Sequence, residues 1–194
     1  TILTKDGRRM SKSLGTGIDP LRLIEQYGAD ATRFALIWQA MGGQDIRWSE
    51  EALMGGKKFL NKIWNASRFV FERTQGIPEI SGVKAKTPAD RAVLAAFKKA
   101  KKSAEKNIDS YEFGTALHEF YDFFWHEFCD RYLEAAKQQL MNDEFAASTA
   151  AILRRVLFDS LKVLHPFLPH ITEAIWSEVR AADKTLLIIE SWPK

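Results

Sequence analysis

Near the start of the chain, five successive residues have the side chains that a polyphosphate-binding loop needs. The string begins with Arg9 and Met10 and continues as Ser11, Lys12 and Ser13. Lysine and arginine neutralise phosphate charge, and serine hydroxyls donate further hydrogen bonds. Because short basic loops are also common on solvated surfaces, composition alone leaves both interpretations open.

A second set of polar and aromatic residues shares one helix face. Asn61, Trp64, Asn65 and Arg68 follow one another at the helical spacing i, i+3, i+4 and i+7. Two amides, an indole and a guanidinium could stack on the bases of single-stranded RNA and bond their edges. Tyr132 is a further ring that could stack on a base. Equally, the two aromatic rings could complete a core while the polar groups bond nearby backbone.

Other chemistries find less support. His118, His126 and Cys129 lie at helical spacing, but without a second cysteine we expect no metal site. The single cysteine excludes an intramolecular disulfide and fits a reducing compartment. No apolar run approaches the roughly 18 residues of a membrane span, so no membrane partner is expected.

Composition is typical of a folded protein with a mild positive charge. The 194 residues are 46% hydrophobic and 12% aromatic, and the formal net charge is +3. That charge permits RNA as a partner without requiring it. Since the chain opens at Thr1 and enters the basic string almost at once, we expect it to be a piece of a larger protein.

The elements that must position these residues are mainly helices. Asp19 and Pro20 are typical of a helix start, and Gly28 of its end. Asp30 is expected to cap the next helix, and Ser49 to open a long third one. Thr87-Pro-Ala-Asp predicts a capping box after a linker over 74–87.

Three more helices are predicted from about Tyr111 to Gln138, from about Asp143 to Leu164, and from the prolines at 166 and 169 to about Arg180. Residues 185–192 are expected to form a short strand or an extended tail. The predicted fold class is mainly α, a helical bundle preceded by a short loop segment.

Several strings in the chain resemble a known family. The string at 9–13 resembles the K-M-S-K-S signature of class I aminoacyl-tRNA synthetases, with Arg9 in place of the first lysine. Further strings that are similar to the valine enzymes of this family are Gly43-Gln-Asp-Ile, Asn61-Lys-Ile-Trp-Asn-Ala-Ser-Arg-Phe, Phe128-Cys-Asp-Arg-Tyr-Leu-Glu and His165-Pro-Phe-Leu-Pro-His. The isoleucine enzymes are the nearest alternative.

The resemblance implies a division of the chain and a role for its loop. Residues 1–48 would end the catalytic domain, and residues 49–194 would form a helical-bundle anticodon-binding domain. The full-length enzyme would use ATP with Mg²⁺ to attach valine to tRNA. Lys12 would be the catalytic residue, and the five residues of the signature string would bind the ATP phosphates.

The resemblance also implies partners and a location. The bundle would bind the anticodon loop of tRNA(Val) through the face of Asn61, Trp64, Asn65 and Arg68, with Tyr132 as a further candidate. ATP and valine would bind through the rest of the catalytic domain. Because the His-Ile-Gly-His signature is absent, we expect this chain alone to be inactive and to bind no cofactor. The expected location is the cytoplasm.

Two alternatives from other classes stay open at the level of the sequence. One is a pure RNA-binding module, and the other is a helical protein-interaction domain whose loop signature arose by chance.

Overall fold

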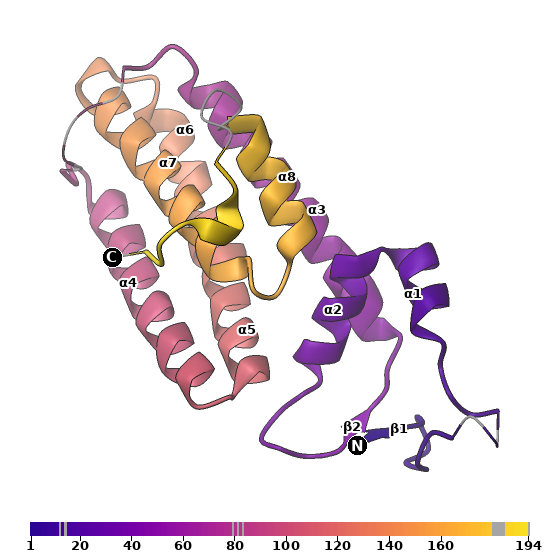
Figure 1. Ribbon diagram of the computed structural model, residues 1–194. Coiled ribbons are helices and arrows are strands. Elements are labelled where there is room, and N and C mark those ends of the chain that lie inside the picture. Colours follow the sequence, from indigo (N-terminus) through magenta and orange to yellow (C-terminus); the bar gives the residue numbers. More distant parts are fainter. Residues whose placement is uncertain are drawn as a thin grey trace.

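The computed structural model describes residues 1–11, 13, 15–78, 80, 82, 84–179 and 185–193. Lys12, the predicted catalytic residue, lies outside the described residues, as does Arg180 at the expected end of the last helix. Figure 1 shows a long helical bundle with a smaller N-terminal unit at one end. The fold class predicted from the sequence, mainly α, is confirmed.

Eight α-helices and two short strands make up the described part of the chain. In chain order, the first elements are β1 (Ile2–Leu3), α1 (Pro20–Tyr27), α2 (Ala29–Trp38), β2 (Ile46–Arg47), α3 (Glu51–Thr74) and α4 (Pro88–Asp109). The later elements are α5 (Phe113–Asp122), the π-helical run η1 (Phe123–Tyr132), α6 (Leu133–Gln139), α7 (Asp143–Leu164), α8 (Pro169–Val179) and the 3₁₀ turn η2 (Leu187–Ile189).

Two of the predicted helix starts have the geometry that their sequences indicate. Asp19 accepts a hydrogen bond from the backbone N–H of Leu21 at 3.0 Å, and Pro20 is the first residue of α1. At α4, the Thr87 hydroxyl accepts from the N–H of Asp90 while the Asp90 carboxylate accepts from the N–H of Thr87. These side chains satisfy backbone donors that a helix start leaves without partners.

The prediction that Asp30 caps its own helix is wrong. Gly28 occupies the cap position of α2, and no side chain caps it. Asp30 lies in the first turn of α2 and turns its carboxylate to the start of α8, where it accepts from the backbone N–H groups of His170 and Ile171. The Asp30 carboxylate therefore binds backbone N–H groups at the start of α8 and not those at the start of its own helix.

Two other predictions need correction. Of the two forms expected for residues 185–192, the short strand does not form, and the extended tail is interrupted by a 3₁₀ turn at Leu187–Ile189 with extended backbone on either side. The turn packs on α8, where the N–H of Leu187 donates to Glu173. The helix expected from 111 to 138 is continuous, but its middle ten residues widen into the π-helix η1. The parallel pair β1–β2, with Ile2 opposite Ile46, was not predicted, because two-residue strands leave no periodic signal.

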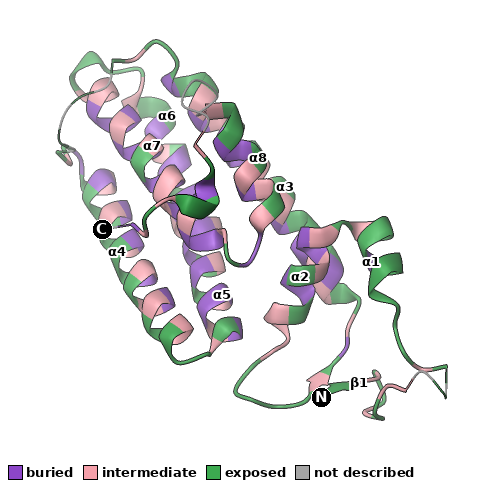
Figure 2. Cartoon of the chain, viewed as in Figure 1, coloured by how far each residue is buried: buried purple, intermediate pink, exposed green. Residues whose placement is uncertain are grey.

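Buried apolar side chains form two clusters. The larger one fills the bundle and includes the rings of Phe120, Phe123, Phe124 and Phe128. The smaller one gathers Leu23, Ala35, Trp48 and Leu53 beside the N-terminal unit. Figure 2 shows this buried seam along the inner faces of the bundle helices. Helix α2 contributes to both clusters and so joins the two parts of the molecule.

Among the described residues, no helix combines the length and the apolarity that crossing a membrane requires.

Candidate nucleic-acid interface

The signature segment folds back on itself beside the small sheet. Leu3 and Arg9 form an antiparallel bridge, and the N–H of Thr4 donates to the carbonyl of Arg8 at 2.8 Å. The backbone N–H of Ser11 donates to the hydroxyl of Thr16 at 3.0 Å. These backbone contacts fix the positions of Arg9 and Ser11, two residues of the signature string, relative to β1 and to Thr16.

A hollow lies along this segment. It has a volume of about 780 Å³, and its lining includes Arg9, Met10 and Ser11. The hydroxyls of Ser11 and Ser13 are 2.7 Å apart, and Arg9 is exposed. A hollow lined by a guanidinium and a hydroxyl suits an anionic oxygen-rich ligand.

Three of the four predicted RNA-binding residues on α3 are exposed. Asn61, Asn65 and Arg68 lie on the outer face of the helix, and Arg68 donates to Glu72 one turn further on at 3.1 Å. Trp64 is half-buried and packs against the main core. The helix therefore presents its amides and guanidinium to solvent and uses most of the indole for packing.

Two residues that the sequence analysis missed lie on the same side of α3. Lys62 and Phe69 flank Asn65 at i−3 and i+4, so the three side chains share one stripe. The Phe69 ring has the Arg73 guanidinium 5.8 Å and the Lys137 ammonium 5.9 Å from its centroid. Like Trp64, the Phe69 ring is half-buried against the main core, and its exposed part with two cations nearby suits contact with a base next to a phosphate. The spacing of these residues was a signal that could have found them.

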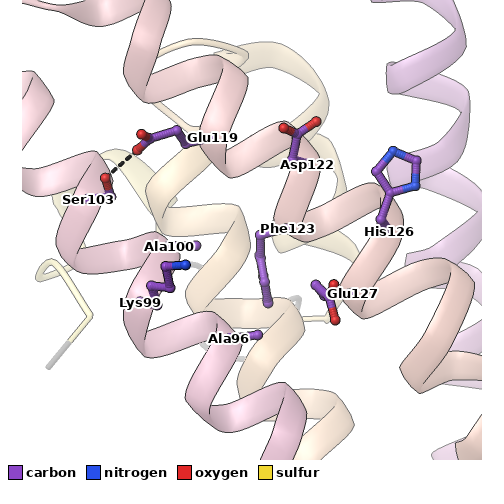
Figure 3. A pocket seen from close by; sticks show the side chains of 9 residues that line it. All are labelled: Ala96, Lys99, Ala100, Ser103, Glu119, Asp122, Phe123, His126 and Glu127. Atoms are coloured by element: carbon purple, nitrogen blue, oxygen red, sulfur yellow. Dashed lines mark hydrogen bonds between the residues drawn. The ribbon is translucent and has the colours of Figure 1, made fainter.

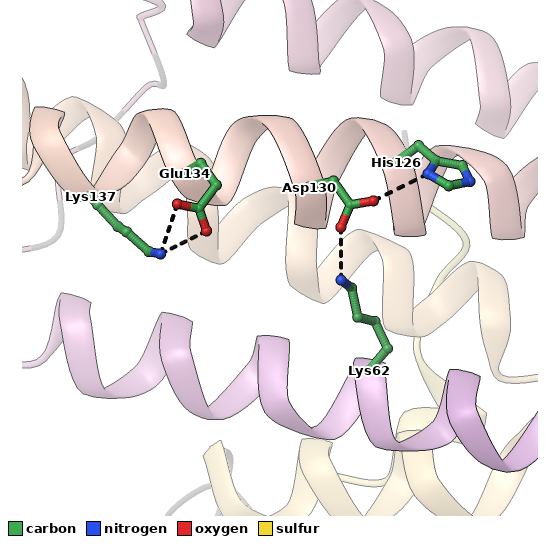
Figure 4. Close-up of polar contacts among 5 residues, drawn as sticks. All are labelled: Lys62, His126, Asp130, Glu134 and Lys137. Carbon is green, nitrogen blue, oxygen red and sulfur yellow. Dashed lines mark hydrogen bonds and ion pairs between the residues drawn. The ribbon is translucent and has the colours of Figure 1, made fainter.

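The π-run η1 and helix α6 form a second wall opposite this stripe (Figure 4). Lys62 reaches across from α3 and donates to Asp130 at 2.8 Å, while His126 lies 3.2 Å from the other oxygen of the same carboxylate. The hydrogen bond from Lys62 is the main cause that lowers the pKa of Asp130. Glu134 pairs with Lys137 at 2.6 Å on the same wall.

Tyr132 does not belong to this exposed surface. Its side chain is buried, with 2% of the residue accessible, and its hydroxyl donates to Asp90 at 2.9 Å. Burial, with the nearby Asp90 charge, raises the pKa of this phenol. Because the ring is enclosed by the core, the structure contradicts the expectation that it is free to stack on an anticodon base.

Another polar groove runs between α4 and the α5–η1 helix (Figure 3). It has a volume of about 650 Å³, and carboxylates at Glu119, Asp122 and Glu127 line it beside a single lysine, Lys99. Excess negative charge disfavours RNA at this face. Within the described ranges, no three His, Cys, Asp or Glu side chains gather in a way that could hold a metal ion.

A helical bundle with an exposed stripe of amides, cations and a half-buried ring, joined to a loop with a cation and hydroxyls, has side chains of the kind that suit RNA and phosphate groups. Comparison with known families supports this interpretation. A family described as the anticodon-binding domain of tRNA ligase matches residues 90–194, more than half of the chain. The chain therefore belongs to the family of anticodon-binding domains of tRNA ligases. A second family, class I tRNA synthetases (I, L, M and V), matches residues 1–49.

Curated relatives extend the match over nearly the whole chain. A valine--tRNA ligase of Bacillus cereus is 42% identical over 99% of this chain, and that of Carboxydothermus hydrogenoformans is 42% identical over 100%. A valine--tRNA ligase of Thermotoga maritima is 40% identical over 100% of the chain. In each case the chain spans only 22% of the relative's length.

A solved structure shares the fold. The LeuRS of Agrobacterium radiobacter K84, crystallised in a ternary complex with tRNA and LeuAMS, superposes with a TM-score of 0.75 over 100% of this chain and 23% of its own. Its sequence identity is 22%, so the likeness concerns the fold alone.

Proposed function

We propose that this chain is the signature-loop and anticodon-binding part of a valine–tRNA ligase. The observation that carries this proposal is the match of the whole chain to valine--tRNA ligases at 40–42% identity. The order of the two family matches, with the synthetase match first and the anticodon-binding match second, supports it. Residues 1–48 would complete the catalytic domain, and residues 49–194 would form the anticodon-binding domain. The relatives named above are valine enzymes, and the isoleucine alternative is not better supported.

The whole ligase would activate valine with ATP and Mg²⁺ and then esterify tRNA(Val) in the cytoplasm. In the first step the carboxylate of valine attacks the α-phosphorus of ATP, and pyrophosphate leaves. Lys12 would stabilise the charge that develops on the phosphates, while Arg9, Met10, Ser11 and Ser13 would hold them. Arg9 keeps the charge of the lysine in the family signature but presents a planar fork.

The exposed stripe of α3 would read the anticodon. Asn65 offers a paired donor and acceptor for a base edge, and the Phe69 ring offers a stacking surface between two cations. Arg68 lies one turn from Asn65 and would meet either a phosphate or a base. Asn61 and the exposed edge of Trp64 would extend the contact toward the start of the helix.

An RNA-binding titration tests this proposal. The chain is titrated against a labelled stem-loop with a valine anticodon and against the same stem with a scrambled loop, at two salt concentrations. We expect tighter binding of the valine loop, with an affinity that falls as salt rises because phosphate contacts release counterions. Lys102→Ala on the exposed face of α4 is the control and should bind like the parent. Equal affinity for both loops would overturn the proposal.

A further inference from the structure

The exposed stripe of α3 contacts η1 and α6 at two places along its length. Lys62 of α3 bonds Asp130 of η1 at 2.8 Å, and the Lys137 ammonium of α6 lies 5.9 Å from the Phe69 ring centroid of α3. Asn65 lies between Lys62 and Phe69 on α3 and is exposed. Because Lys62 neighbours Asn65 on α3 and bonds Asp130, a base that reaches Asn65 would lie near the Asp130 carboxylate.

Asp130 is fixed in place by partners from two directions. Lys62 donates to its Oδ1, His126 lies 3.2 Å from its Oδ2, and the Lys62 ammonium is itself held over the Trp125 ring at 5.0 Å. The side chain nevertheless keeps 43% of its surface accessible. Each carboxylate oxygen has two lone pairs, so both retain capacity to accept a further hydrogen bond.

The chemistry of this carboxylate selects among possible ligands. The negative charge of the Asp130 carboxylate repels a phosphate. The carboxylate accepts a hydrogen bond from an N–H group, but it has no hydrogen to donate to a carbonyl oxygen. Cytosine and adenine present an exocyclic amino group where uracil and hypoxanthine present a carbonyl oxygen. Aspartate accepting from the amino group of cytosine is an established form of base discrimination.

We propose that Asp130 is a specificity-determining residue beside the exposed α3 stripe, where its carboxylate accepts a hydrogen bond from the exocyclic amino group of an anticodon base. This inference rests on the proposed function, since it names a base contact at the same surface. Lys62 and His126 act as positioning residues that hold the carboxylate. The π-helical widening of η1 carries Asp130 on the wall that faces α3.

The test compares Asp130→Asn with a matched variant, Glu134→Gln, on the same wall. Both changes remove one carboxylate charge, but Glu134 pairs with Lys137 of its own helix and makes no hydrogen bond to α3. Each protein is titrated against the valine stem-loop and against loops in which one anticodon cytosine becomes uracil or one adenine becomes hypoxanthine. Thermal melts confirm that both variants fold.

In the parent chain we expect at least one such replacement to weaken binding by about fivefold or more. Asp130→Asn should bring that ratio close to one, because an amide can donate to a carbonyl as well as accept from an amine. Its affinity for the valine loop should stay similar or rise, because Lys62 loses a competing anion. Glu134→Gln should keep the discrimination of the parent.

Discrimination that survives in Asp130→Asn would overturn this inference and leave the proposed function standing. A parent chain that prefers the valine loop but tolerates every replacement would also overturn it. Failure of the parent chain to distinguish valine and scrambled loops would overturn the proposed function itself.

Discussion

The Asp30 carboxylate on α2 accepts a hydrogen bond of 2.7 Å from the backbone N–H of Ile171, which lies 141 positions later at the start of α8. A second bond, from the N–H of His170, measures 3.3 Å. Arg33, one turn along α2, donates to the carbonyls of Pro166 and Phe167 in the preceding corner. The Asp30 carboxylate lies at the N-terminus of α8, and the Arg33 guanidinium lies at carbonyls just after the C-terminus of α7. Helix dipoles favour a negative charge at the first position and a positive charge at the second.

Replacing Asp30 should therefore destabilise the whole chain. Asp30→Ala removes a buried carboxylate and leaves two part-buried N–H groups of α8 without their acceptor, so we expect the free energy of unfolding to fall by about 1–3 kcal/mol. Urea unfolding followed by circular dichroism measures it. Asp19→Ala removes an exposed cap from α1 and should cost less. Equal losses in the two variants would contradict the burial argument.

Replacing the adjacent glycines Gly55 and Gly56 of α3 with alanine should change the stability of the protein in opposite directions. A Cβ at Gly56 would lie 2.9 Å from the Phe34 ring and 3.2 Å from the carbonyl oxygen of Ala31, so Gly56→Ala should destabilise by about 1–3 kcal/mol. A Cβ at Gly55 meets nothing within 4 Å. Gly55→Ala should stabilise by about 0.5–1 kcal/mol through helix propensity. Thermal melts of the pair distinguish packing from propensity, and a shift of the same sign in both would refute the close approach of α2 to α3.

The polar residues of α3 should affect RNA binding in different ways. Arg68→Ala should weaken binding and flatten its salt dependence if the guanidinium meets a phosphate. Asn65→Ala should mainly relax discrimination between anticodons, by about 1–3 kcal/mol, because an amide carries no net charge. Trp64→Ala should instead lower stability, since the indole packs against the core. Stem-loop titrations beside thermal melts test all three variants. If Arg68→Ala and Asn65→Ala both bind RNA like the parent, this face of α3 does not recognise the anticodon.

Lys12 should matter for the rate of adenylate formation more than for the binding of valine. In the whole ligase, we expect Lys12→Ala to slow valine-dependent pyrophosphate exchange roughly a hundredfold, because one charge-assisted contact in the transition state contributes on the order of 3 kcal/mol. The Michaelis constant for valine should change little. Lys5→Ala, a nearby cation paired with Glu51, is the control. An unchanged rate in Lys12→Ala would refute its assignment.

Cys129 should be unreactive while the protein is folded. Burial raises the pKa of its thiol to about 12, so the reactive thiolate is scarce near neutral pH. Labelling with a thiol reagent at pH 8 should be slow in the native chain and rapid in urea. The folded state holds this proton more tightly than the unfolded state, so the site's contribution to stability should fall as pH rises from about 9 to about 12. Fast labelling of the native chain would contradict the observed burial.

Local signals in the sequence determined the helices and the type of chemistry. Proline at N1 of α1 and the Thr87–Asp90 capping box fix where two helices begin, because the partners of each cap lie within three residues. The signature string and the spacing of Asn61, Asn65 and Arg68 similarly depend only on neighbouring residues. Such features follow from the chain itself, and the structure places the two helix caps as expected.

The tertiary structure alone decided what depends on distant partners. Asp30 could have capped α2, but the start of α8 offered two unsatisfied donors in a part-buried place, where a hydrogen bond contributes more. Tyr132 could have faced solvent, but its hydroxyl donates a hydrogen bond to Asp90 of α4 inside the core. The pairing of Lys62 on α3 with Asp130 on η1 likewise joins residues 68 positions apart. Periodicity shows which residues share a face of one helix, but only packing determines which other helix that face meets.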